Sequence, residues 1–175
     1  MLTHTTMGSP IGDLTLVNEG GVLAGIWMGA VPAARAGRIG RPATAGFERA
    51  IEQLDGYFAG TRTSFDVPIA MGGDGFHRRV WRLLLEIPYG ETRSYGDLAR
   101  ELGDVGLARA VGVANARNPL PIVVPCHRVI GSDGSLTGYA GGLDRKRFLL
   151  ELESGVRPLF AGEEPTASRE GQAEG

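Results

Sequence analysis

A glycine-rich segment, Met71-Gly72-Gly73-Asp74-Gly75, divides the sequence into two parts with different hydrophobic periodicity. Before it, short β-prone runs alternate with turns, whereas after it apolar residues recur mainly at helical spacing. Because glycine weakens the interior of both helices and strands, such a segment is typical of a linker. We therefore predict an α/β protein with an N-terminal α/β unit over residues 1–72 and a mostly helical C-terminal unit over residues 73–157.

The N-terminal part predicts a small antiparallel sheet followed by one helix. Residues 3–7, 14–17 and 22–28 favour strands and are separated by turns that contain glycine, which is the pattern of a meander. Segment 30–45 is rich in alanine, glycine, proline and arginine, has no clear period, and is predicted to be a loop. Apolar residues at helical spacing predict a helix over residues 47–58.

Four helices are predicted in the C-terminal part. A break at Pro88-Tyr89-Gly90 ends the first, and Asn118-Pro119 stops the third because the residue before proline avoids the α region. The apolar run 120–124 resembles a short strand. The predicted helices cover residues 76–87, 95–102, 106–117 and 143–153.

Two of these helices form a predicted helix-turn-helix. Ser94 is a good N-cap, and Asp97 three residues later completes a capping-box pattern. The helix that starts there ends near Gly103, and the next one follows after a short glycine-containing turn. Two short helices around such a turn are typical of motifs that bind DNA.

Cys126 is the only cysteine, which excludes an intramolecular disulfide and zinc sites that need several thiolates. Residues 76–153 carry 11 positive and 9 negative charges, against 5 and 7 in residues 1–75, and this weakly favours a polyanionic partner. No apolar run approaches the roughly 18 residues that span a membrane, and residues 1–10 lack a signal-peptide pattern. We expect a cytoplasmic protein with a disordered, acidic tail over residues 158–175.

Cys126 is also a candidate nucleophile. A thiol with a pKa of about 8.5 is mostly protonated at neutral pH and needs a base. His127 is adjacent, and Glu153 in the last predicted helix is a candidate to orient the imidazole, which would complete a Cys-His-Glu relay. The same three residues also have purely structural interpretations. Cys126 would then be a small buried hydrophobe, His127 a hydrogen-bonded core histidine, and Glu153 part of a solvated helix face. The residues by themselves leave both interpretations open.

The pentapeptide Pro125-Cys126-His127-Arg128-Val129 resembles the active-site signature of the O6-alkylguanine-DNA alkyltransferases, also called methylated-DNA–protein-cysteine methyltransferases. The resemblance extends over residues 76–153, and Ser9-Pro10-Ile11-Gly12 is similar to the family's opening hairpin. So many ordered motifs are more specific than the pentapeptide alone. They include Ile87-Pro88-Tyr89-Gly90, Thr92-Arg93-Ser94-Tyr95, Ala108-Arg109-Ala110-Val111-Gly112, Asn118-Pro119 and Gly138-Tyr139-Ala140-Gly141-Gly142.

This resemblance implies a ribonuclease-H-like N-terminal unit and a winged-helix-like C-terminal unit. It implies a monomer that repairs double-stranded DNA by one irreversible, stoichiometric transfer of an alkyl group from O6 of guanine to Cys126, without a cofactor. Some members of the family hold zinc in the N-terminal unit through cysteine and histidine. Because this chain has no cysteine there, we expect no metal.

The resemblance also implies roles for five residues in the reaction. Cys126 would accept the alkyl group, with His127 as the base acting through a water and Glu153 holding His127. Asn118 would brace the chain before the cysteine. Tyr95 would donate a hydrogen bond toward the departing guanine, which fits the need to stabilise charge as guanine leaves.

Arg109 corresponds to the family residue that enters the base stack when the damaged nucleotide swings out. O6 lies inside the duplex, so chemistry on it requires base flipping. The small residues Ala108 and Ala110 would let this helix approach DNA closely, in the minor groove and with little sequence readout. For an unassigned helix, tight packing with one exposed arginine is the alternative. Further DNA contacts are implied for Thr92, Ser94, Arg117 and Arg128.

A glycine-containing loop is similar to the one that lines the family's guanine pocket. The pocket residues that the resemblance implies are Val129, Tyr139, Ala140 and Gly141. Some relatives carry a hydroxyl residue at the position of Ala140, so one side-chain contact to the base is missing in this chain.

Two other functions compete with alkyl transfer. Alkyltransferase-like proteins bind O6-alkylguanine without transferring anything, but they lack the acceptor cysteine that this chain has. A cysteine hydrolase would use the same three residue types and turn over repeatedly, although a cysteine directly followed by its histidine is unlike a protease pair assembled in space.

Overall fold

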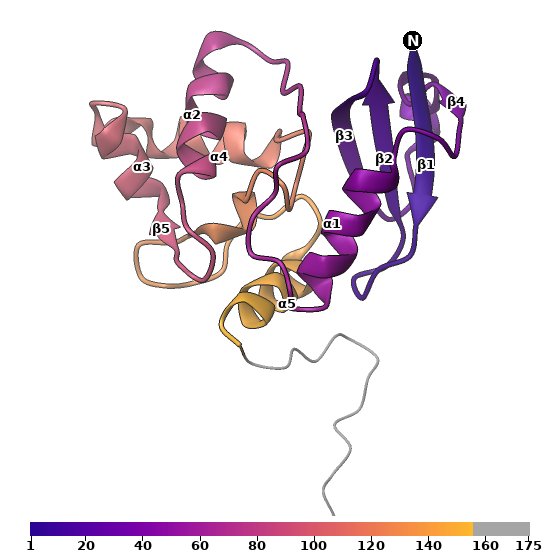
Figure 1. Ribbon diagram of the computed structural model, residues 1–175. Coiled ribbons are helices and arrows are strands. Elements are labelled where there is room, and N and C mark those ends of the chain that lie inside the picture. Colours follow the sequence, from indigo (N-terminus) through magenta and orange to yellow (C-terminus); the bar gives the residue numbers. More distant parts are fainter. Residues whose placement is uncertain (156–175) are drawn as a thin grey trace, which may run out of the picture.

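The computed structural model describes residues 1–155, and its N-terminal part is a four-stranded sheet with one α-helix (Figure 1). The strand order is β3-β2-β1-β4, in which the first three strands are antiparallel and β4 pairs parallel with β1. This confirms the predicted meander and helix. The elements are β1 (Leu2–Met7), β2 (Leu14–Glu19), β3 (Val22–Met28), β4 (Arg41–Pro42) and α1 (Glu48–Phe58).

Segment 30–45, predicted to be a loop, holds more structure than its composition indicates. A 3-10 helix, η1 (Ala33–Arg38), precedes β4. Gly40 between them has a φ of +74°, and a Cβ there would clash with the backbone of Leu2 in β1. The segment therefore joins the sheet through a position that only glycine fits.

The C-terminal part is mostly helical, as predicted. Asp74 caps α2 by accepting a hydrogen bond from the backbone N–H of His77, and the Ser94–Asp97 capping box at the start of α3 is present. α3 and α4 pack against each other around the predicted turn. The elements are α2 (Gly75–Leu85), β5 (Arg93–Ser94), α3 (Tyr95–Glu101), η2 (Val105–Leu107), α4 (Ala108–Ala116), η3 (Cys126–Arg128), β6 (Val129–Ile130) and α5 (Leu143–Glu153).

The expectation of a strand over residues 120–124 is wrong. This run is a buried turn in which Ile122 has a φ of 77° and the Val124 N–H donates to the Leu120 carbonyl at 2.8 Å. Asn118 bonds the backbone of the same turn at both ends of its amide. The run is apolar because the turn is buried, and a short apolar run does not by itself distinguish a strand from such a turn.

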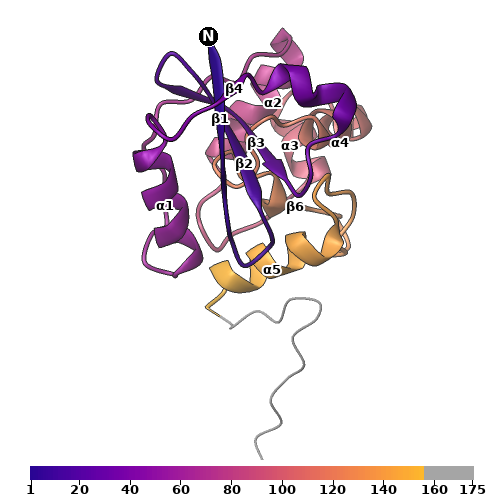
Figure 2. The same ribbon diagram turned by 90° about the vertical axis from the view of Figure 1, so that its right-hand side faces the viewer.

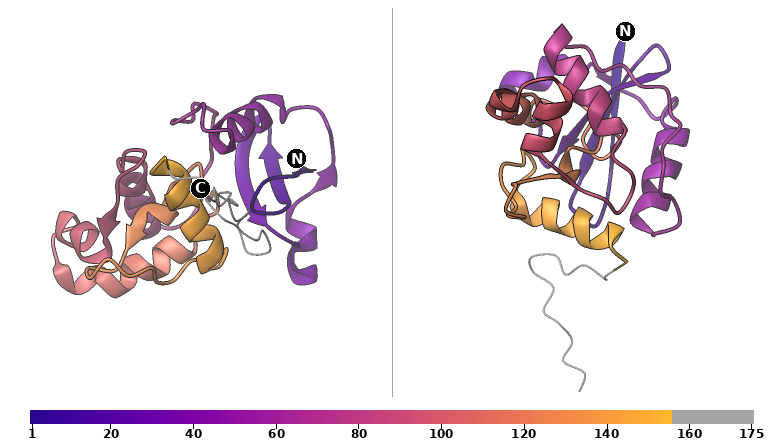
Figure 3. Two further views of the ribbon diagram at one scale, coloured as in Figure 1. Left: turned by 90° about the horizontal axis from the view of Figure 1, so that it is seen from below. Right: turned by 90° about the vertical axis from the view of Figure 1, so that its left-hand side faces the viewer.

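The two parts share one hydrophobic core. The Ile26 N–H of β3 donates to the Pro119 carbonyl at 2.9 Å, and the Arg145 guanidinium of α5 donates to the Ile11 carbonyl at 2.8 Å. The segment between the parts runs along β3, where the Leu23 N–H donates to Pro68. Figures 2 and 3 show α5 at one end of the molecule, next to both the sheet and the C-terminal helices.

Three further predictions concern the boundary between the two parts, the C-terminal tail and the absence of a membrane span. The division of the chain at residues 72 and 73 stays a prediction. The tail at residues 158–175 lies outside the described residues. Within residues 1–155, no helix is long and apolar enough to cross a membrane.

Candidate active site around Cys126

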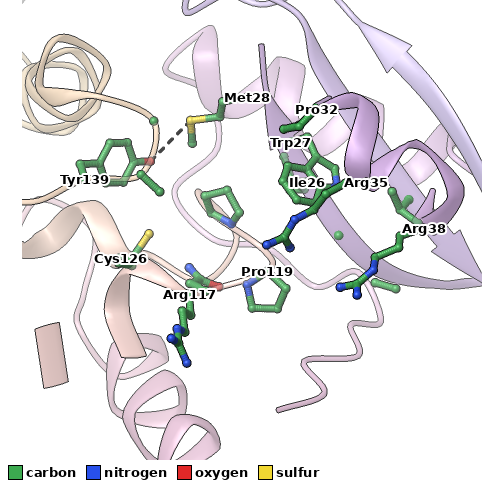
Figure 4. Close-up of a pocket in the computed structure, with 18 of the residues that line it drawn as sticks. Ile26, Trp27, Met28, Pro32, Arg35, Arg38, Arg117, Pro119, Cys126 and Tyr139 are labelled. Carbon is green, nitrogen blue, oxygen red and sulfur yellow. Dashed lines mark hydrogen bonds between the residues drawn. The ribbon is translucent and has the colours of Figure 1, made fainter. Parts of the chain in front are cut away.

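Cys126 begins the 3-10 turn η3 and lines a cavity between the two parts of the chain. Its side chain is nearly buried, at 4% exposure, and Figure 4 shows its sulfur turned toward Tyr139. The cavity measures about 900 Å³, which is within the roughly 300–1,000 Å³ of small-molecule sites. The thiol therefore borders a cavity with the volume of a small-molecule site.

Behind the cysteine, the Glu153 carboxylate takes part in five hydrogen bonds, one of them from Nη2 of Arg128 at 3.1 Å. It lies 2.5 Å from Nε2 of His127 and accepts from Nε of Arg128 at 2.7 Å. It also accepts from the Tyr57 hydroxyl at 2.6 Å and from the Gly90 N–H at 3.2 Å. The structure thus pairs His127 with Glu153, two of the three residues of the expected relay. Tyr57 and Gly90 join them although the sequence analysis did not single them out.

The charges in this cluster set the protonation states. Burial by itself would raise the pKa of Glu153, but the hydrogen bonds and positive charge of His127, with those of Arg128, hold that pKa well below its ordinary value. Burial lowers the pKa of His127 below its ordinary 6.5, and the charges of Arg128 and Lys146 lower it further against the opposing effect of Glu153. At neutral pH we therefore expect a carboxylate and a neutral imidazole.

The thiol is under the opposite constraint. Burial raises the pKa of Cys126, while the Asn118 amide and the Lys146 ammonium act to lower it. Because burial opposes ionisation, the sulfur needs a group that takes its proton.

Only two buried side-chain polar atoms in residues 1–155 lack a hydrogen-bond partner, and they belong to a sequence neighbour of Cys126 and to a residue that bonds its backbone. They are Nδ1 of His127 and Oδ1 of Asn115, whose Nδ2 donates to the Cys126 carbonyl at 3.2 Å. Since Nε2 of His127 faces the carboxylate, Nδ1 is the ring nitrogen with a free lone pair. Buried polar atoms without partners are rare and require an explanation, of which a catalytic role is one.

Arg128 was expected to contact DNA, and the structure contradicts this. Its side chain is 7% exposed and is paired with Glu153. Its Nη1 donates to the Ile87 carbonyl at 2.6 Å, and its guanidinium lies over the Tyr89 ring. An arginine with all these partners inside the protein has no charge to offer to a phosphate.

The turn before Cys126 is braced by Asn118, as expected from its position. Nδ2 of Asn118 donates to the Val124 carbonyl at 2.7 Å, and Oδ1 accepts from the Leu120 N–H at 3.0 Å. The sequence analysis missed Asn115, which lies in α4 among small residues that gave no signal for a polar contact. The two amides together hold the backbone on both sides of the cysteine.

The loop after Cys126 is held by a buried lysine. Lys146, the only lysine of the sequence, is fully buried, and its Nζ donates to the Val129 carbonyl at 2.5 Å and to the Thr137 carbonyl at 2.9 Å. The Tyr95 hydroxyl donates to the same Thr137 carbonyl at 3.1 Å. Tyr95, expected to act on the leaving guanine, is thus bound to the loop in this structure. The sequence feature that could have drawn attention to Lys146 is that the chain has no other lysine.

Three of the four expected pocket residues line the cavity: Tyr139, Ala140 and Gly141. The Tyr139 hydroxyl donates to the Met28 sulfur at 3.8 Å, as the dashed line in Figure 4 shows. A Cβ on Gly141 would meet both side chains, so the loop needs glycine there to close against β3. Val129, the fourth, is fully buried and does not line the cavity.

The residues expected to contact DNA differ in their exposure and in whether their side chains already have partners within the protein. Arg109 on α4 and Thr92 are exposed, and Arg109 has no ion-pair or hydrogen-bond partner within the described part of the chain. Arg117 is exposed at the cavity, opposite Arg35 and Arg38 of η1 (Figure 4). By contrast, the Ser94 hydroxyl is occupied by the cap of α3. The partly buried side chains of Ala108 and Ala110 flank Arg109.

No metal-binding cluster occurs in this region. Among the side chains of residues 1–155, no group of three or more histidines, cysteines, aspartates or glutamates is placed to hold an ion.

Comparison with known protein families matches nearly the whole described chain. Residues 2–71 match the ribonuclease-like domain of 6-O-methylguanine DNA methyltransferase, and residues 75–155 match its DNA-binding domain. The methylated-DNA–protein-cysteine methyltransferase of Mycobacterium tuberculosis is 51% identical over 158 residues, covering 90% of this chain and 96% of that protein. That of Methanosarcina acetivorans is 59% identical over 107 residues, covering 61% and 69%.

Solved structures are similar in the same way. The crystal structure of the Mycobacterium tuberculosis O6-methylguanine methyltransferase superposes with a TM-score of 0.82 at 51% identity, covering 89% of this chain and 94% of that one. The Mycobacterium tuberculosis OGT in complex with DNA gives a TM-score of 0.81 at the same identity, covering 89% and 95%. With both halves matched by family models and by relatives above 50% identity, the chain belongs to the 6-O-methylguanine DNA methyltransferase family.

Proposed function

We propose that this protein repairs DNA by moving the alkyl group of O6-alkylguanine onto Cys126, once per molecule. The observation that carries the proposal is the buried, unpartnered Nδ1 of His127, the residue that directly follows a cysteine lining a cavity of about 900 Å³. The relatives named methylated-DNA–protein-cysteine methyltransferase support it, as does the one whose structure contains DNA. No cofactor is needed, and the protein acts as a monomer.

In the proposed reaction, the His127–Glu153 pair acts as the base. Glu153 binds Nε2–H of the ring, so Nδ1 accepts the proton of the Cys126 thiol through a bridging water. The resulting imidazolium is stabilised by the carboxylate. The thiolate then forms only when the base is in place, because burial opposes it otherwise.

The transfer itself is a displacement at carbon. The Cys126 sulfur attacks the alkyl carbon, the S–C bond forms as the C–O6 bond breaks, and guanine leaves with the electron pair. The Tyr95 hydroxyl donates a hydrogen bond toward the leaving base, after exchanging its bond to Thr137. Since the thioether product has no route back to a thiol, each molecule reacts once.

Access to O6 requires a flipped nucleotide, and α4 is the element that we assign to this step. Arg109 enters the stack in place of the base, with Ala108 and Ala110 allowing the helix into the minor groove. Thr92 and Arg117 contact the backbone of the DNA. Val129, Tyr139, Ala140 and Gly141 form the pocket for the flipped base.

The rival functions are less well supported. An alkyl-binding protein without transfer would not need the acceptor cysteine, and a cysteine directly followed by its histidine is unlike the pair of a cysteine hydrolase, which is assembled in space. We also propose a cytoplasmic location, because a single reactive thiol stays reduced in the cytosol.

Incubation with duplex DNA containing one O6-methylguanine should add one methyl group to each active protein molecule. Mass spectrometry of the intact chain measures the adduct, and peptide sequencing places it on Cys126. Unmodified duplex is the control. An unchanged mass after incubation with excess substrate would exclude transfer, and an adduct elsewhere would exclude the assigned acceptor.

Arg109→Ala should slow repair of duplex DNA by about 5- to 30-fold, because the flipped state loses a side chain that stabilises it by an estimated 1–2 kcal/mol. Reaction with free O6-benzylguanine, which needs no flipping, should keep its rate. Single-turnover rates on both substrates make the comparison, and Arg147→Ala, which removes an exposed charge on α5, is the control for general attraction to DNA. Equal slowing on both substrates would contradict a role in flipping.

A further inference from the structure

Tyr57 links the N-terminal part to the Glu153 cluster. It lies near the end of α1, is 0% exposed, and donates its hydroxyl proton to Oε2 of Glu153 at 2.6 Å. The same oxygen faces Nε2 of His127 at 2.5 Å, and the hydroxyl is 3.5 Å from that nitrogen. The tyrosine and the histidine therefore share one carboxylate oxygen.

This hydroxyl is held in place by its surroundings. The ring of Tyr57 packs edge-on against Phe58 and Tyr89 and at a tilt against Phe65. Burial and the negative charge of Glu153 raise the pKa of Tyr57 far above its ordinary value, so the group remains a donor at every working pH. A buried donor with one acceptor in reach is a fixed constraint on that acceptor.

We propose that Tyr57 is a positioning residue of the reaction, whose hydroxyl fixes the carboxylate of Glu153 and, through it, the ring of His127. This rests on the proposed function. It gives the N-terminal sheet-and-helix part a direct share in the chemistry, across a sequence separation of 96 residues between Tyr57 and Glu153. Without the hydroxyl, the shared oxygen would keep only His127 and Nη2 of Arg128 as partners.

Several groups bear on the titration of His127, and the proposal concerns only one of them. Arg128 and Lys146 disfavour the charged ring, and Glu153 favours it. Loss of the Tyr57 donor concentrates charge on the oxygen next to Nε2, which favours the imidazolium. The titratable and charged groups that act on His127 or Glu153 are Tyr57 from α1, Tyr89 from the loop after α2, Arg128 from η3 and Lys146 from α5.

The test is Tyr57→Phe in the full chain. We expect the single-turnover rate on O6-methylguanine duplex to fall about tenfold at neutral pH, because the base is held less firmly. We also expect the titration midpoint of His127, followed by NMR of the histidine ring carbons, to rise by about half a pH unit or more. The chain has only 3 histidines, so the signal can be assigned.

Tyr89→Phe is the matched control, because its hydroxyl lies in the same region but donates to the Leu152 carbonyl at 3.5 Å and not to the carboxylate. It should change neither quantity. Fluorotyrosine placed at position 57 keeps the packing and makes the hydroxyl a stronger donor, so it should lower the His127 midpoint.

The outcomes separate the proposals. The inference would be overturned if Tyr57→Phe had the same single-turnover rate and the same His127 titration midpoint as the unchanged chain. It would also be overturned if the variant were slower and less stable but kept the same His127 midpoint. The ring titration needs no substrate. If the unchanged chain fails to accept a methyl group, the proposed function falls while the midpoint still tests the contact.

Discussion

We expect Cys126→Ser to abolish methyl transfer, so that no adduct is detectable after incubation with excess O6-methylguanine duplex. A serine hydroxyl at this position remains protonated beside a neutral imidazole of lowered pKa, so the nucleophile never forms. The substitution keeps size and shape, and the side chain does not contact the exposed face of α4 that we assign to DNA. Intact mass spectrometry measures the loss of transfer.

Binding is the second measurement for this variant. Its dissociation constant for the same duplex should match that of the unchanged chain, as judged by fluorescence anisotropy at one fixed salt concentration. A variant that melts normally but no longer binds would show that Cys126 serves recognition more than chemistry.

Glu153→Gln should lower the free energy of unfolding by about 3–5 kcal/mol, the usual cost of removing one partner of a buried ion pair. The neutral amide leaves the Arg128 guanidinium buried without its counter-charge and faces three donors that had shared a carboxylate. Urea unfolding measures the difference. Glu151→Gln removes the same charge from the same helix outside the cluster and should cost little.

The pH dependence of this effect has a definite sign. The folded pKa of Glu153 lies below its ordinary 4.5, so the stabilisation is fully present above pH 4.5 and is lost as pH falls toward the folded pKa. The difference in unfolding free energy between the unchanged chain and Glu153→Gln should therefore shrink in acid. A difference that stays constant from pH 7 to pH 3 would contradict the depressed pKa.

Local signals in the sequence predicted most of the elements. The Ser94–Asp97 capping box, the helix over 143–153 and the first three strands all depend on residues close together in the chain, and each is present. The apolar run 120–124 failed because burial, and not strand pairing, explains its composition. Spacing alone cannot distinguish these two causes.

The site was predictable only in part. The residues around Cys126 are contiguous in sequence, so the motif contains them. The contacts of Tyr57 and Lys146 join distant segments, and neither residue differs locally from an ordinary core or helix-surface residue. Arg128 was misjudged because an arginine near a DNA-binding motif has the same sequence signal whether its charge is paired inside or exposed.

The placement of Glu153 at the very end of α5 has a consequence for the newly made protein. While the ribosome is still synthesising the last helix, Arg128 and His127 have no counter-charge, although the cysteine and everything before it already exist. In the proposed reaction, the base of the thiol is therefore complete only after Glu153 has been added and α5 has packed into the core. A chain released early, short of this helix, would carry the acceptor sulfur without the means to use it.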